Sequence, residues 1–131
     1  MTLVTDTRFL ITFWFPPTKE VKMKISKLMN LSLKEGLIVP VIVIAEYVKV
    51  AGGRIGLEAA KSHIYLLVSK GAEIANIDNQ VALKAGEIAL RHPEVPMVDA
   101  LIASVAIIKK AKYILTDDPH FRVMGLKTKW I

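Results

Sequence analysis

The chain has 131 residues, 53% of them hydrophobic, which is enough for one α/β core and too short for a second domain. The absence of cysteine excludes a disulfide framework, a thiolate nucleophile and a zinc finger. A formal net charge of +6 suits an anionic partner such as nucleic acid, although solubility alone could also explain it. Because the sequence has neither a membrane-spanning run nor a signal-peptide pattern, we expect a soluble cytoplasmic protein that does not bind membranes.

Short apolar runs alternate with amphipathic segments along the whole chain. The expected strands are residues 2–6, 37–39, 73–77, 113–115 and 128–131. The expected helices are residues 8–15, 18–33, 55–69, 78–90 and 96–110, together with one that begins at Pro40 and is broken by Gly52-Gly53. Asp78 is the expected N-cap of its helix. This order predicts a three-layer α/β/α sandwich around a short, mostly parallel sheet of four or five strands, in a single domain over residues 1–131.

Four carboxylates lie in or beside apolar runs, where a charge is costly to bury. Asp6 and Asp118 each follow a predicted strand, whereas Glu46 and Asp99 lie inside predicted helices. Buried acids are normally paired with a cation or bind a metal, and no Arg or Lys stands beside each of these in the sequence. Taken singly, Asp6 or Asp118 could be a helix N-cap, Asp99 a first-turn residue favoured by the helix dipole, and Glu46 an exposed residue.

The predicted topology brings these acids toward one edge of the sheet. Asp6 and Asp118 follow strand ends, and Asp99 lies in the first turn of a helix that begins at the same edge. Glu46 lies about two turns into its helix and must reach across to the others. Such an arrangement of carboxylates suits Mg²⁺ or Mn²⁺ better than zinc, and an ion held there could promote hydrolysis of a phosphodiester.

Four short motifs resemble those of the PIN-domain family of metal-dependent ribonucleases, and the small single-domain form resembles VapC-type toxins. The motifs are Asp6-Thr7, Ile44-Ala45-Glu46-Tyr47, Val98-Asp99-Ala100-Leu101-Ile102-Ala103 and Thr116-Asp117-Asp118-Pro119-His120-Phe121. The last fits a Thr-x-Asp-x-x-Phe pattern, which assigns the fourth acid to Asp118 and leaves Asp117 at a variable position. Arg8 departs from the pattern, because a small residue is usual there.

The resemblance implies a PIN-like fold and a metal-dependent endoribonuclease that acts on RNA and is held inactive by a small antitoxin protein. It implies that Asp6, Glu46, Asp99 and Asp118 are the catalytic and metal-binding residues, with Thr7 and Thr116 supporting them. The implied cofactor is Mg²⁺ or Mn²⁺, and a homodimer is expected. Arg8 and His120 are candidate substrate contacts.

Three other functions are alternatives to this one. An RNA-processing PIN nuclease without an antitoxin shares the chemistry, and neighbouring genes would distinguish it. A phosphohydrolase of the haloacid-dehalogenase type needs a second acid two residues after the first, where this chain has Arg8. A non-catalytic RNA-binding or interaction module has no need for all four acids together.

Overall fold

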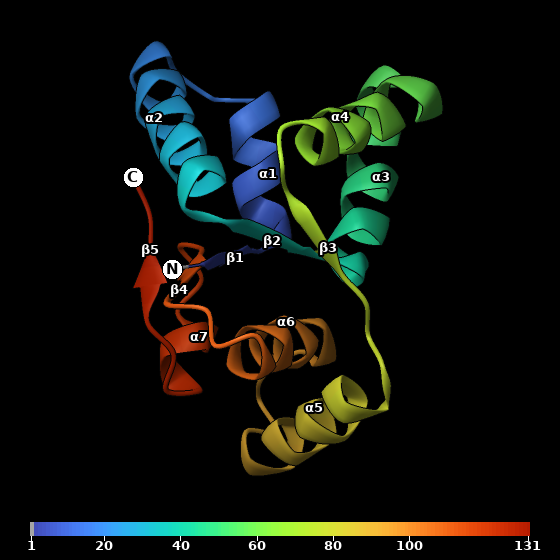
Figure 1. Ribbon diagram of the computed structural model, residues 1–131, viewed down its shortest axis with the longest axis vertical. Coiled ribbons are helices and arrows are strands. Elements are labelled where there is room, and N and C mark those ends of the chain that lie inside the picture. Colours follow the sequence, from blue (N-terminus) through green and yellow to red (C-terminus); the bar gives the residue numbers. More distant parts are fainter. Residues whose placement is uncertain (1) are drawn as a thin grey trace.

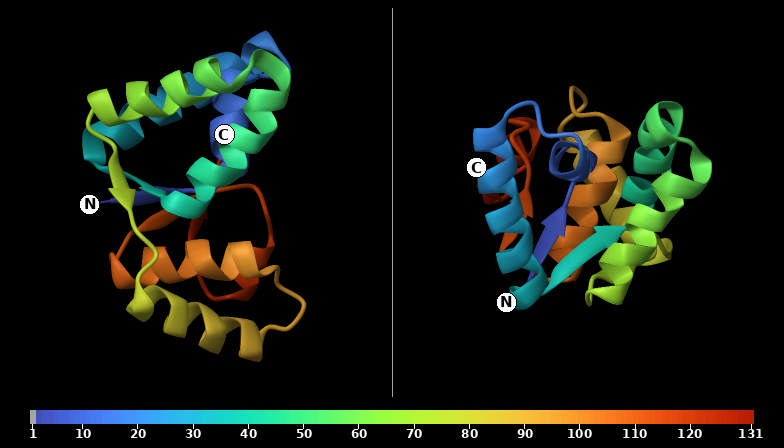
Figure 2. Two further views of the ribbon diagram at one scale, coloured as in Figure 1. Left: turned by 90° about the vertical axis from the view of Figure 1, so that its right-hand side faces the viewer. Right: turned by 90° about the horizontal axis from the view of Figure 1, so that it is seen from above.

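The computed structural model describes residues 2–131, in which helices enclose a five-stranded, all-parallel sheet. The strands are β1 (Leu3–Thr5), β2 (Leu37–Pro40), β3 (Glu73–Ala75), β4 (Tyr113–Leu115) and β5 (Thr128–Lys129). The helices are α1 (Thr7–Trp14), α2 (Lys19–Glu35), α3 (Val41–Ile55), α4 (Leu57–Ser69), α5 (Asn79–Arg91), α6 (Met97–Ile108) and α7 (His120–Val123). Helices α1 to α4 cover one face of the sheet and α5 and α6 the other, so the expected α/β/α sandwich is confirmed (Figures 1 and 2).

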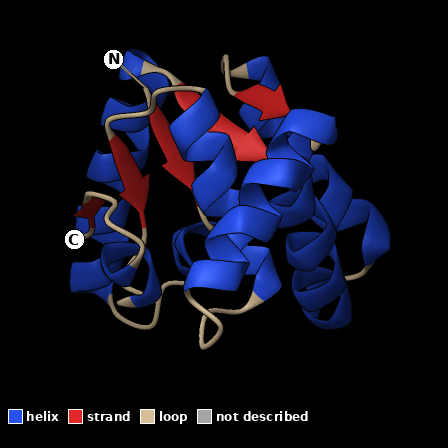
Figure 3. Cartoon of the chain, turned by 90° about the horizontal axis from the view of Figure 1, so that it is seen from below, coloured by secondary structure: helices blue, strands red, loops and turns tan. Residues whose placement is uncertain are grey.

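The strand order is β3-β2-β1-β4-β5, which places β1 at the centre of the sheet. Leu3 pairs in parallel with Leu37 on one side and with Tyr113 on the other. Leu3, Val4 and Thr5 are at most 1% exposed, because helices cover β1 on both faces. Since all five strands run in the same direction, their carboxyl ends share one edge (Figure 3).

Side chains and prolines at the helix starts explain why several helices begin where they do. The side chains of Asp6, Thr18 and Asp78 accept hydrogen bonds from backbone N–H groups in the first turns of α1, α2 and α5. Pro40 and Pro96 precede α3 and α6 with φ angles of −61° and −58°. The expected N-cap at Asp78 is therefore confirmed.

The expected helix break at Gly52-Gly53 is wrong. Helix α3 continues through both glycines to Ile55, and the break falls at Gly56, whose φ of 90° is compatible with a chain turn but not with a helix. A glycine inside a helix costs only about 1 kcal/mol relative to alanine, which the packing of α3 against α4 and α1 offsets. The short helix α7 was not expected from the sequence.

Candidate active site

Asp6 directly follows β1 at the centre of the sheet and also caps α1. Its Oδ1 accepts a hydrogen bond of 2.9 Å from the Phe9 backbone N–H, and the residue is 4% exposed. Burial away from water raises the pKa of Asp6 to about 7, against the opposing effect of hydrogen bonds from the Thr116 side chain and Phe9. Without a nearby cation, this carboxyl is therefore substantially protonated near neutral pH.

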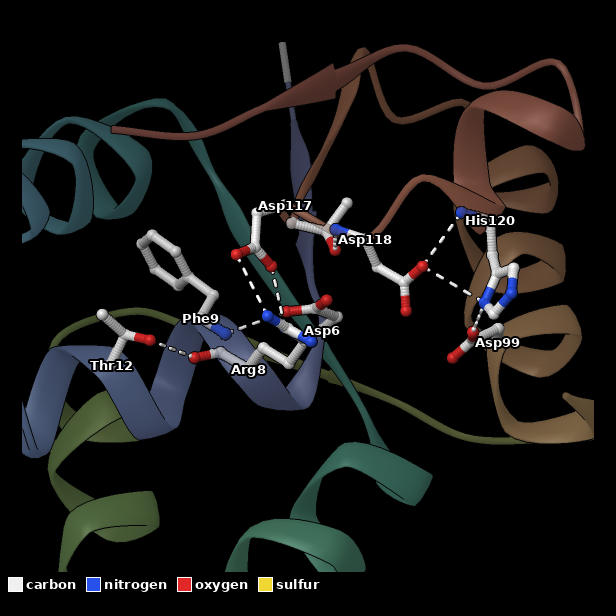
Figure 4. A network of polar contacts seen from close by, with 9 residues as sticks. Asp6, Arg8, Phe9, Thr12, Asp99, Asp117, Asp118 and His120 are labelled. Carbon is white, nitrogen blue, oxygen red and sulfur yellow. Dashed lines mark hydrogen bonds and ion pairs between the residues drawn. The ribbon is translucent and has the colours of Figure 1, made fainter.

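Asp99 and Asp118 converge on the ring of His120, although they come from different elements (Figure 4). The His120 Nδ1 atom lies 3.0 Å from Asp99 Oδ2 and 3.1 Å from Asp118 Oδ1. One ligand atom from each of the three residues lies within 4.8 Å of the others. Asp99 stands in the first turn of α6, as expected, and Asp118 lies in the loop after β4.

The loop that carries Asp118 is fixed by its own hydrogen bonds. The Asp118 backbone N–H donates to Thr116 Oγ1 at 3.0 Å, and the His120 backbone N–H donates to Asp118 Oδ1 at 2.9 Å. Phe121 is fully buried below the loop. The Thr116 side chain also lowers the pKa of Asp6, so Thr116 influences the acid after β1 as well as the acid after β4.

The electrostatics of Asp99 reflect the crowding of carboxylates at this edge. Burial raises the pKa of Asp99, and the hydrogen bond from His120 opposes the rise. The negative charges of Asp118 and Glu46 raise the pKa further. Glu46 therefore lies close enough to Asp99 for its charge to affect the pKa of Asp99.

Glu46 is turned toward α1 and lies outside the tight group of three residues. Its Oε1 accepts a hydrogen bond from the Thr7 hydroxyl, which joins α3 to the start of α1. Within residues 2–131, Asp99, Asp118 and His120 form the only group of at least three potential ligands within 4.8 Å of one another. Asp6, directly after β1, and Glu46, inside α3, flank this group.

Arg8 and Asp117 form an ion pair on the outer side of the acids. The Arg8 Nε atom lies 2.7 Å from Asp117 Oδ1, and Nη2 donates to Oδ2 at 3.1 Å, so the contact is bidentate. The side chain of Arg8 is 61% exposed and that of Asp117 36%. Asp117 therefore faces Arg8, whereas its neighbour Asp118 faces Asp99 (Figure 4).

Comparison with known proteins identifies the family. The family model described as PIN domain matches residues 3–127. The chain belongs to the PIN-domain family. The resemblance seen in the four acidic motifs is therefore confirmed at the level of the family. No curated protein matches the sequence.

Solved structures share this PIN fold over nearly the full chain. The VapBC2 structure from Rickettsia felis, bound to a promoter DNA fragment, contains a chain with a TM-score of 0.80 and 19% identity, covering 99% of this chain and 98% of that one. VapC20 of Mycobacterium tuberculosis, described as a sarcin-ricin loop cleaving toxin, gives a TM-score of 0.79 at 18% identity, with coverage of 95% and 96%. FitAcB from Neisseria gonorrhoeae gives 0.70 at 19% identity, with coverage of 97% and 96%.

The acidic group of this PIN domain fits a divalent cation. Two carboxylates converge on one imidazole nitrogen, and Asp118 Oδ1 also accepts a hydrogen bond from the His120 backbone N–H. Carboxylate oxygens are the preferred ligands of Mg²⁺ and Mn²⁺. Asp99 and Asp118 would hold such an ion, with Asp6 and Glu46 contributing negative charge from either side.

The sequence suggested that His120 could touch substrate or metal, but it did not predict that the His120 ring lies against both the Asp99 and Asp118 carboxylates. The available signal was its position two residues after Asp118 and directly before the buried Phe121. That spacing allows a tight turn to bring the ring back over the Asp118 carboxylate. Its approach to Asp99, which is 21 positions away in the sequence, depends on the packing of the loop against α6.

Proposed function

We propose that this PIN-domain protein is a metal-dependent endoribonuclease and the toxin of a VapBC-type toxin–antitoxin pair. The observation that carries the proposal is the convergence of Asp99 and Asp118, with Asp6 and Glu46 beside them, at the carboxyl edge of a PIN fold. Structural neighbours that are toxins or toxin–antitoxin complexes support the toxin assignment.

The proposed cofactor is Mg²⁺ or Mn²⁺, held by Asp99 and Asp118 with Asp6 and Glu46 nearby. Such an ion, when bound, polarises a phosphodiester oxygen and promotes ionisation of a water molecule. The chain's own residues orient this site. Thr116 fixes the Asp118 loop, and Thr7 holds the Glu46 carboxylate toward α1.

The protein environment also shifts the pKa values of two acids of the site, Asp6 and Asp99. Burial raises the pKa of Asp6 to about 7, so without a bound divalent cation Asp6 is partly protonated near neutral pH, and burial also raises the pKa of Asp99. A divalent cation favours their ionised forms, which makes ion binding stronger as pH rises through neutrality. The proposal therefore includes a cleavage rate that increases from mildly acidic toward mildly basic pH.

Cleavage of a mixed RNA pool tests the enzyme assignment. Purified protein is incubated with the pool in Mg²⁺, Mn²⁺ or EDTA, and product ends are mapped. We expect cleavage at internal positions with either ion and none in EDTA. Asp99→Asn should abolish it. Asp78→Asn is the matched control, because this exposed acid caps α5 far from the acids and asparagine can also cap a helix. Metal-independent cleavage, or full activity of Asp99→Asn, would contradict the assignment.

The partners are a separate part of the proposal. A VapBC-type toxin predicts a small DNA-binding antitoxin encoded by a neighbouring gene, and its co-expression should suppress cleavage. The alternative of an RNA-processing nuclease predicts no such gene.

We also propose a cytoplasmic homodimer. Leu83 and Leu90, 77% and 83% exposed on the outermost helix α5, provide apolar surface for association, which light scattering on the purified protein would measure. No helix within residues 2–131 has the length and apolar character needed to cross a membrane.

A further inference from the structure

A large cavity lies directly beside the acidic group, between β4, α7 and β5. Its volume is about 680 Å³. Its wall includes Tyr113, Thr116, Asp117, Arg122, Lys127 and Trp130. None of the four acids predicted as catalytic lines this cavity, so it is distinct from the site described above.

The cavity and the acidic group share one wall. Thr116 accepts a hydrogen bond from the Asp118 backbone N–H and lowers the pKa of Asp6, while its neighbour Asp117 forms an ion pair with Arg8. A molecule in the cavity would therefore contact Thr116 and Asp117, which directly precede the proposed cation-binding residue Asp118 in the loop after β4. This position suits the nucleotide next to a scissile phosphate in a bound strand.

The aromatic part of the wall is rigidly supported. The Trp130 ring packs edge-on against Phe9, with centroids 5.9 Å apart and an interplanar angle of 74°. The backbone N–H of the same Phe9 donates a hydrogen bond to the Asp6 carboxylate. Tyr113 lies under the ammonium groups of Lys112 and Lys129, at 5.5 Å and 5.7 Å from its centroid. Half-buried aromatic rings of this kind stack on nucleobases of any sequence.

The cations of the wall are available for an anionic ligand. Within residues 2–131, neither Arg122 nor Lys127 has a carboxylate within 4.0 Å, whereas the one acid of the wall, Asp117, is neutralised by Arg8. The cavity thus combines unpaired positive charge with aromatic surface. A polyanion without bases would use only the charge, and an apolar peptide only the rings.

We propose that this cavity binds a nucleotide of single-stranded RNA adjacent to the scissile phosphate. The base would stack on Trp130, and the backbone phosphates would contact Arg122 and Lys127. The inference rests on the proposed ribonuclease function and adds to it the path of the substrate, from the acids past Thr116 and Asp117 into the cavity.

Tryptophan fluorescence provides a direct test, because the chain has two tryptophans, Trp14 and Trp130. Trp14 stacks on His63 of α4 and does not line the cavity. The variant Trp14→Phe therefore reports on Trp130 alone, and the variant Trp130→Phe reports on Trp14 alone.

Each variant is titrated in EDTA with a short single-stranded RNA of mixed sequence, and free tryptophan provides the correction for absorbance by the RNA. We expect saturable quenching in Trp14→Phe and none in Trp130→Phe. Equal quenching of Trp130 by polyphosphate, or no quenching by RNA, would overturn base stacking.

Surface charge variants test the same cavity without altering its packing. Binding of labelled RNA is measured by anisotropy for Arg122→Gln/Lys127→Gln and for the matched control Lys19→Gln/Lys22→Gln, whose exposed cations on α2 also lack ion pairs within residues 2–131. We expect roughly 10-fold weaker binding for the cavity variant and a salt-dependence slope smaller by about 1.4, as expected for two lost contacts to a single strand. The control should keep the wild-type slope. The same loss in both variants would overturn the proposal.

These binding measurements are independent of catalysis. If the wild-type protein binds RNA as expected but never cleaves it with Mg²⁺ or Mn²⁺, the ribonuclease function fails while the subsite stands. If the wild-type protein cleaves RNA but the cavity variant binds as tightly as the control, only the subsite fails.

Discussion

Replacing Asp6 with Asn should stabilise the metal-free protein by an amount that grows with pH. Asp6 is 4% exposed and its pKa is raised from 3.8 to about 7, chiefly by burial. Asparagine has nearly the same shape and its side-chain oxygen can still cap α1. The substitution therefore removes an ionisable group from a buried position and leaves the packing almost unchanged.

The sign and size follow from proton binding in the folded and unfolded states. Between about pH 4 and pH 7, folded Asp6 holds a proton that the unfolded chain has released, so its contribution to stability is lost as pH rises. The change in pKa from 3.8 to about 7 corresponds to roughly 4 kcal/mol once both states are ionised. Because protonated Asp resembles Asn, the two proteins should be similarly stable near pH 4. The asparagine variant should be more stable by up to about 4 kcal/mol near pH 8.

Urea unfolding in EDTA at about pH 4, 6 and 8 measures this difference. Asp78→Asn is the control, since this exposed acid is also a helix N-cap and its replacement should give no comparable dependence on pH. Comparison with wild type at each pH cancels the titration of all other groups. A difference between wild type and Asp6→Asn that stays constant from acidic to basic pH would refute the reasoning.

Three further outcomes are expected. Saturating Mg²⁺ or Mn²⁺, at about 100 times the dissociation constant, should stabilise the wild-type fold by roughly 2.7 kcal/mol, and a melting temperature unaffected by either ion would argue against the site. Asp118→Asn should lose at least about 10-fold in cleavage rate and far more than Asp117→Asn, because Asp118 faces Asp99 while Asp117 faces Arg8; the reverse order would show that the motif is shifted by one residue. Burial lowers the pKa of His63, so its contribution to stability is present above its ordinary pKa of about 6.5 and is lost as pH falls below that value. The variant His63→Gln should therefore lose less stability than wild type in thermal melts between about pH 7 and pH 5. An equal loss in both proteins would assign the effect to other groups.

The sequence predicted the elements whose signals are local. Asp6 and Asp118 follow buried strands, and Asp99 opens a helix, so the edge of the sheet at which they lie could be deduced from strand and helix order alone. Asp78 was predicted as an N-cap because capping depends on residues only three positions apart.

Features that depend on tertiary packing could not be predicted in this way. Helix α3 continues through Gly52 and Gly53 although Gly53 is exposed, because the preceding turns are anchored by the buried residues Val43, Tyr47 and Ala51, and the helix propensity of glycine is only slightly unfavourable. The Arg8–Asp117 ion pair joins residues 109 positions apart, and no local pattern marks such a contact. The position of His120 between Asp99 and Asp118 likewise appears only when the loop packs on α6.

The pairing of β1 with β4 has a consequence for synthesis of the chain. β1 is made first, yet one of its two neighbours, β4, comes more than a hundred residues later, and the Asp118 loop follows β4. Long-range strand pairing of this kind forms late in folding. A nascent chain on the ribosome thus has Asp6, Glu46 and Asp99 before it has the segment that carries Asp118 and His120. The acidic group can assemble only after the segment that carries Asp118 and His120 has emerged, more than a hundred residues after β1, which would delay the proposed cleavage of RNA during synthesis of the chain.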